Sequence, residues 1–134
     1  MRRIIILAAA ALVGSQIVWA EGFEVRLGFT NAHLRELFFG CSDKGTDGYD
    51  RGLDDFAPPP GIEVGTIGFF PPKKMPFFYR DIRGLEGPHQ WKLYVKVFRG
   101  KPITISWDKE TFPEGWVFAL TQGETTTLMD EETE

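Results

Sequence analysis

Apolar and polar residues alternate along several stretches of the chain, which is the period of a β-strand with one buried face. The clearest stretch is 23–29, where Phe, Val, Leu and Phe alternate with Glu, Arg and Gly. The same alternation recurs in 91–97 and in 103–107, and the link Arg99–Pro102 between them has the length and the glycine of a hairpin turn. We therefore expect three strands here, the last two paired as a hairpin.

Weaker strand patterns occur in four further stretches, which are 34–39, 63–69, 77–82 and 116–120. Clusters of Pro, Gly and Asp separate them, and these residues end strands because they remove backbone donors or favour turns. No stretch after residue 20 has the period of an amphipathic helix. The pattern predicts an all-β fold of about seven short strands, arranged as an antiparallel immunoglobulin-like β-sandwich that buries one face of each strand.

Residues 1–20 have the pattern of a secretory signal peptide. Arg2 and Arg3 precede an apolar run over 4–13. Val18 and Ala20, a β-branched and a small residue, occupy the two positions that a signal peptidase reads before the first acidic residue, Glu21. The apolar run is about ten residues long, shorter than the roughly 20 that a membrane-spanning helix needs. We expect cleavage before Glu21, a secreted protein at an extracellular, cell-surface or periplasmic location, and no membrane insertion after cleavage.

Removal of residues 1–20 from the 134-residue chain leaves 114 residues, enough for one domain with a single core. We expect the β-sandwich domain to span 21–124. Residues 125–134 begin with threonines and end in an acidic run, so they are predicted to form a mobile tail.

Charge and cysteine content narrow the classes of partner. The predicted signal peptide, or leader, contains two of the 15 basic residues. The chain after cleavage therefore carries 13 basic and 19 acidic residues, a net charge of −6. A negatively charged chain without a basic stripe argues against nucleic acid and against acidic lipid as partners.

Cys41 is the only cysteine, so no disulfide forms within the chain. It is either a small buried hydrophobic residue or a thiol for an intermolecular bridge or a reaction.

An aspartate-rich loop is the strongest candidate for chemistry. A hard cation such as calcium needs several oxygen ligands. The loop offers the carboxylates of Asp43, Asp47, Asp50, Asp54 and Asp55. Their spacing does not match the Asp-x-Asp-x-Asp-Gly pattern of an EF-hand or dockerin loop. The alternative is structural, because aspartates also form turns by accepting hydrogen bonds from nearby backbone amides.

The stretch 43–60 is predicted to form an ordered strap across one end of the sheet. Tyr49, Leu53 and Phe56 recur every three or four residues, so they can anchor the loop to the sandwich. Pro58–Pro60 stiffen its exit because prolines fix φ and do not join a strand ladder. We expect Tyr49 and Phe56 to hold the strap, and its aspartates to bind mostly backbone amides.

Most aromatic residues alternate with polar residues on predicted strands, so core packing explains them best. Trp107 is expected to be buried for this reason. Two loop stretches, Phe69–Pro72 and Pro76–Tyr79, are harder to bury on all sides. They are predicted to form a patch that docks a protein partner or a cell-surface assembly. Exposed rings can alternatively stack on sugars, which would make carbohydrate the ligand.

Several segments together carry a resemblance to a known class of protein. In order, they are Thr46–Asp50 (TDGYD), Asp54–Asp55, Ala57–Pro60 (APPP), Arg80–Arg83 (RDIR), Trp91–Val95 (WKLYV), Ile103–Asp108 (ITISWD) and Pro113–Gly115. Over roughly residues 23–130 the chain resembles an immunoglobulin-like β-sandwich segment of large secreted bacterial surface proteins. Such segments are found with dockerin repeats, hook-capping-like immunoglobulin domains or C-terminal sorting domains. The resemblance implies a structural or adhesive module whose molecular role is unassigned.

The family continues with further strands after a Met-Asp pair, whereas this sequence ends four residues after Met129-Asp130. This departure indicates either a minimal version of the module or a truncated reading frame.

No enzyme motif is present in the sequence. The two histidines, His33 and His89, belong to no HExxH pair, and the chain has no Gly-x-Ser-x-Gly elbow and no phosphate-binding glycine loop. We therefore expect a secreted non-catalytic structural or adhesive module that binds a protein partner and needs no cofactor. The alternative is a module that binds calcium or carbohydrate through the aspartate-rich loop or exposed aromatic rings.

Overall fold

The computed structural model describes residues 2–10, 12–13, 16–17, 22–46, 48–60, 63–71, 76–85, 89–108, 110, 112, 116–122 and 125–129. These residues form twelve strands and contain no α-helix, so the predicted all-β class is confirmed. The strands are β1 (Arg2–Ala10), β2 (Leu12–Val13), β3 (Gln16–Ile17), β4 (Phe23–Phe29), β5 (Glu36–Cys41), β6 (Asp55–Phe56), β7 (Thr66–Phe69), β8 (Phe78–Arg83), β9 (His89–Lys96), β10 (Ile105–Ser106), β11 (Trp116–Gln122) and β12 (Thr125–Leu128).

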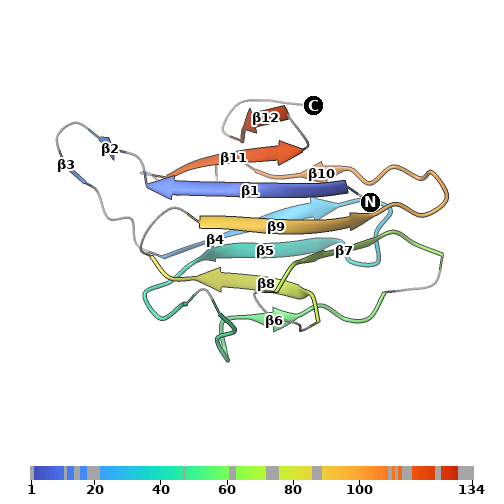
Figure 1. The fold of residues 1–134 in the computed structure, drawn as a ribbon, viewed down its shortest axis with the longest axis horizontal. Helices are drawn as coiled ribbons and strands as arrows, with labels where there is room; N and C mark the ends of the chain where they lie inside the picture. The colour runs from blue at the N-terminus through green and yellow to red at the C-terminus, as the bar shows by residue number, and fades with distance from the viewer. Residues whose placement is uncertain are drawn as a thin grey trace.

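Ten of these strands belong to one curved sheet (Figure 1). Their order is β10-β4-β5-β8-β7-β9-β1-β11-β12, and β6 pairs with β8 outside this path. The remaining two strands, β2 and β3, pair only with each other among the described residues.

The prediction of a purely antiparallel sheet is wrong for β5 and β8. These strands run parallel, with Phe38 opposite Arg80 and Cys41 opposite Arg83. A parallel pair needs a long connection between its strands. Residues 42–77 supply it, and they contain the aspartate-rich loop, β6 and β7.

The sheet folds over on itself around Phe39. The ring of Phe39 on β5 lies 5.0 Å from that of Trp91 on β9 and 5.9 Å from that of Phe118 on β11, measured between centroids. In the sheet order, β8, β7, β9 and β1 separate β5 from β11. A flat sheet would hold two such strands far apart, since neighbouring strands lie about 4.8 Å from each other. The two halves therefore face each other across one aromatic core.

The two ends of the strand order also meet. The indole Nε1–H of Trp107, just after β10, donates a hydrogen bond of 2.7 Å to the carbonyl oxygen of Met129, just after β12. Met129 is fully buried, whereas Trp107 is only half-buried against the core, so the expectation of a buried indole holds in part.

Alternation along the chain sets which side chains enter the core. On β4, Val25, Leu27 and Phe29 are buried while Glu24 and Arg26 are exposed, as the sequence predicts. The same holds on β9, where Trp91, Leu93 and Val95 are buried and Lys92 is exposed. The predicted small buried hydrophobic role of Cys41 is also confirmed, since it is 2% exposed in the core cluster.

The predicted hairpin between 91–97 and 103–107 is wrong. The turn itself exists, because Lys101 donates its N–H to the carbonyl oxygen of Phe98 at 3.0 Å. Beyond the turn the chain leaves β9 and joins β4, with Ile105 opposite Phe29. The hairpin does not extend because both edges of β9 are already paired, one with β7 and the other with β1.

The weaker strand predictions correspond to β5, β7, β8 and β11, with ends shifted by a few residues. Thr125–Leu128, which the sequence pattern assigned to a mobile tail, form β12 against β11. Threonine suits an edge strand because its branched Cβ favours the extended backbone. Residues 130–134 lie outside the described residues.

Residues 2–10, assigned by the sequence pattern to the signal peptide, form β1 in the uncleaved chain. The strand lies between β9 and β11, and its Ile4 and Ile6 side chains are 4% and 0% exposed. Isoleucine and leucine suit a buried strand as well as the apolar run of a leader, so one sequence satisfies both patterns. Cleavage before Glu21 stays a prediction.

Because Phe39 contacts both halves of the sheet, Phe39→Ala should lower the free energy of unfolding by about 3 to 5 kcal/mol. Urea unfolding of the uncleaved 134-residue chain, followed by tryptophan fluorescence, measures the loss. Val97→Ala, at a position 41% exposed, is the control and should change stability by no more than about 0.5 kcal/mol. A loss below about 1 kcal/mol for Phe39→Ala would contradict its central position.

Candidate functional site

Asp50 and Asp54 accept hydrogen bonds from the backbone of the aspartate-rich loop. Asp50 accepts from the amide of Thr46 at 2.6 Å and from its hydroxyl at 2.9 Å. Asp54 accepts from the amide of Asp50 at 2.7 Å and, through its other oxygen, from the amide of Ile82 on β8 at 2.7 Å. The expectation that the aspartates bind backbone amides is confirmed for these two residues.

The other carboxylates of the predicted metal site have different partners. Asp43 accepts a hydrogen bond of 3.3 Å from the hydroxyl of Ser42, and Asp55 on β6 forms an ion pair of 3.2 Å with Arg80. Asp47 lies outside the described residues. Within the described ranges, no group of three or more His, Cys, Asp or Glu side chains is arranged to hold a metal ion.

Asp54 is the most buried of these carboxylates, at 2% exposure. Burial raises its pKa to about 6, and the amide hydrogen bonds from Ile82 and Asp50 oppose part of that shift. Both of its oxygens face backbone donors, so Asp54 ties the loop to β8 rather than presenting a free acid to solvent.

Tyr49 and Phe56 hold the strap against the sheet, as the sequence predicts. Their rings are stacked, with centroids 4.8 Å apart and planes 10° apart, and both contact the ring of Phe78, which is fully buried. Even so, Tyr49 is 40% exposed and Phe56 41% exposed. The pair therefore anchors the loop through one side and presents aromatic surface to solvent through the other.

Next to this pair lies an apolar groove of about 420 Å³. Its walls come from the strap, from β7 and from the segment before β8, and the lining residues are His33, Phe56, Ala57, Pro58, Pro59, Pro60, Thr66, Ile67, Pro76 and Phe77. Among the described residues of this lining, His33 is the one that can ionise, and its Nδ1 accepts a hydrogen bond of 3.4 Å from the amide of Ile67. We call Tyr49, Phe56, Pro58–Pro60, Pro76 and Phe77 the aromatic–proline face.

Phe77 extends this face toward β9. Its ring stacks on that of Tyr94, with centroids 4.7 Å and planes 19° apart, and Phe70 meets both rings edge-on. The predicted docking patch is thus only partly available, because Phe69 and Phe78 are fully buried while Phe70 and Phe77 are half-buried.

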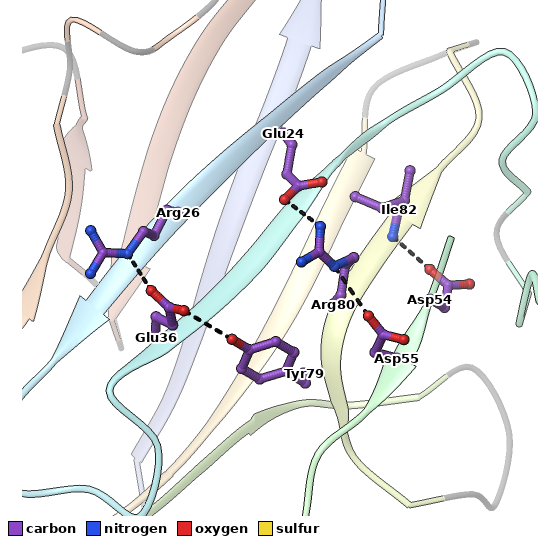
Figure 2. Close-up of polar contacts among 8 residues, drawn as sticks. All are labelled: Glu24, Arg26, Glu36, Asp54, Asp55, Tyr79, Arg80 and Ile82. Atoms are coloured by element: carbon purple, nitrogen blue, oxygen red, sulfur yellow. Dashed lines mark hydrogen bonds and ion pairs between the residues drawn. The ribbon is translucent and has the colours of Figure 1, made fainter. Parts of the chain in front are cut away.

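Charged residues pair with one another on the side of β4, β5 and β8 that points away from the core (Figure 2). Arg26 forms an ion pair with Glu36, which also accepts a hydrogen bond of 3.1 Å from the hydroxyl of Tyr79. The hydrogen bond from Arg26 lowers the pKa of Glu36 below its ordinary value. Burial, and then the hydrogen bond to Glu36, raise the pKa of Tyr79.

Arg80 lies between the carboxylates of Glu24 and Asp55 (Figure 2). Its guanidinium stands 4.5 Å from the ring centre of Phe38. It also lines a second hollow of about 560 Å³, together with Phe23, Cys41 and Leu53. Two carboxylates neutralise its charge, so this hollow does not have the net positive charge that would attract an anion. The network joins β4, β6 and β8 instead.

Sequence reasoning found the strap but missed the groove. Its walls come from stretches that are far apart in sequence, around residues 33, 56–60, 66–67 and 76–77. The alternation signal ends at strand boundaries, so it does not show which loops meet. The three consecutive prolines were the available signal, since they indicate an extended apolar segment at the surface.

No protein-family model, curated protein or solved structure matches this chain. In the part of the chain that the structure describes, there is no helix with the length and apolar character needed to cross a membrane.

The folded-state pKa of Asp54, about 6, lies above the value of about 3.9 of an unfolded aspartate. The folded chain therefore binds an extra proton between about pH 4 and pH 6, and the contribution of Asp54 to stability falls as the pH rises through this window. Asp54→Asn has no such titration. The stability of the wild type relative to Asp54→Asn should decrease from pH 4 to pH 7 in urea unfolding. A difference that is constant or grows with pH would contradict the raised pKa.

Proposed function

We propose that this chain is a secreted, non-catalytic structural or adhesive module of a bacterial surface protein system, with an immunoglobulin-like β-sandwich arrangement. The folding of the sheet around Phe39 supports the two-layer arrangement, because strands from both halves contribute to one core. The resemblance of the TDGYD, APPP and RDIR segments to secreted surface proteins supports the setting.

The observation that carries this proposal is the aromatic–proline face. A concave apolar groove beside two rings that are each about 40% exposed is the kind of surface that binds a partner. Aromatic side chains dominate the energetics of protein interfaces, and prolines present a rigid wall with little entropy to lose. We infer that the face attaches the module to a protein of the cell surface.

Carbohydrate binding is the second candidate, favoured by the stacked rings of Tyr49 and Phe56, whose exposed sides are suited to stacking on sugars. Calcium binding has less support. Asp50 and Asp54 already accept backbone hydrogen bonds, and Asp55 is paired with Arg80.

The proposed location requires export and cleavage of the leader. Protein secreted by the producing cell should begin at Glu21, which mass spectrometry of the intact secreted chain will detect directly. Recovery of secreted protein that retains residues 1–20 would contradict the proposed processing. Recovery only inside the cell would contradict the proposed location.

Attachment through the aromatic–proline face predicts that Tyr49→Ala/Phe56→Ala lowers retention on isolated cell envelopes at least about tenfold, since loss of an aromatic anchor costs about 2 kcal/mol or more. Retention of the immobilised protein is measured by envelope pull-down, after thermal melting has shown that the variant is folded. Leu128→Ala truncates a side chain on β12 that is as exposed as Phe56, at 41%, and serves as the matched control.

Equal retention of the double variant and the wild type would contradict attachment through this face. If free sugars abolish the retention of the wild-type protein, the ligand of this face is carbohydrate and not a protein. A glycan array would then identify the class of sugar.

A further inference from the structure

β1 lies between β9 and β11 and is antiparallel to both (Figure 1). Seven register positions pair it with each neighbour. Ile6 stands opposite Trp91 on one side and opposite Leu120 on the other. The same residues form the leader whose removal belongs to the proposed function, and the inference below rests on that removal.

Removal of β1 would leave β9 and β11 about two strand spacings apart, or roughly 10 Å. The unpaired backbone groups along both strands favour a new partner, because a buried amide or carbonyl without one is costly. Direct pairing of β9 with β11 would have to close this gap by one strand width. Trp91 on β9 and Phe118 on β11 both pack on Phe39, so closure would disrupt the aromatic core.

We propose that loss of the leader creates a strand-acceptor slot between β9 and β11, and that an extended segment of another protein fills it. The slot fixes the direction of that segment, which must run antiparallel to β9 and β11, as β1 does. This pairing is a form of strand addition, in which backbone hydrogen bonds give affinity and alternate side chains give specificity.

The neighbours of β1 define which side chains the incoming segment needs. Positions equivalent to Ile4 and Ile6 point into the core, since these side chains are 4% and 0% exposed, and they must be apolar. The position equivalent to Ile5 lies on the outer face, opposite Lys92 on β9 and Thr121 on β11. Lys92 is exposed, and so is Lys96 farther along the same strand. The exposed ammonium of Lys92 therefore favours a segment with an acidic residue at the position equivalent to Ile5.

The test is a strand-exchange experiment on the 134-residue chain with residues 1–20 retained. A site for a sequence-specific protease is placed in the segment that joins β1 to β4, and the purified folded protein is cut there. Fluorescent peptides with the sequence of residues 2–10 and a soluble tail are then added in excess, and their incorporation is followed by anisotropy. The cut protein should incorporate the parent peptide, whereas Ile4→Asp/Ile6→Asp in the peptide should reduce its affinity at least a hundredfold, because two carboxylates would enter an apolar core.

The acidic preference is tested with single substitutions in the same peptide. Ile5→Glu should bind about two- to fivefold more tightly than Ile5→Lys, the effect of one exposed ion pair. High salt should remove this difference, and Lys92→Glu in the protein should reverse it.

Three results would overturn the proposal. The cut strand could leave while the amides of β9 and β11 stay protected from hydrogen exchange, which would mean that the sheet closes without a donor. The parent peptide and its double-aspartate variant could bind equally, which would exclude the inward positions as the basis of recognition. Equal binding of Ile5→Glu and Ile5→Lys would exclude an acidic segment. The cut is made in vitro, so these results do not depend on export or on the aromatic–proline face.

Discussion

The packing of Phe39 against Trp91 and Phe118 is the contact on which the rest of the structure depends. It joins strands that are far apart in the order of the sheet, so it converts one long curved sheet into two facing halves. Non-polar burial supplies most of the stability of a domain of this size, and each large aromatic ring in such a core contributes several kcal/mol, on the order of 3 to 5. Cys41 adds no internal covalent link, because it is the only cysteine.

Both proposed interaction sites follow from this folded sheet. On one side, the parallel pairing of β5 and β8 requires a long connection, and that connection carries the aspartate-rich loop, the prolines and the aromatic–proline face. On the other side, β9 and β11 are held in place by their packing on Phe39, so the position of β1 between them is defined even without β1 itself. The core thus fixes the shape of one surface groove and of one backbone slot.

Local patterns in the sequence predicted local features well. Alternation identified the buried face of β4 and of β9, and the aspartates that bind neighbouring amides, such as Asp50 with Thr46, act over a few residues. Pairing between strands was harder to predict, because it depends on which edges remain free. The hairpin after β9 failed for this reason, since β7 and β1 already occupy its two edges. The groove was not predicted because its walls come from four separate stretches of the chain. β1 was not predicted because its residues also have the pattern of a signal peptide.

The most direct test of the folded sheet is a nuclear Overhauser measurement between the rings of Phe39 and Phe118 in the uncleaved 134-residue chain. We expect cross-peaks from Phe39 to both Trp91 and Phe118, whose ring centres lie 5.0 and 5.9 Å away. Cross-peaks from Phe39 to Phe69 on β7, without any to Phe118, would mean that the sheet is open and would contradict both the shared core and the strand slot beside it.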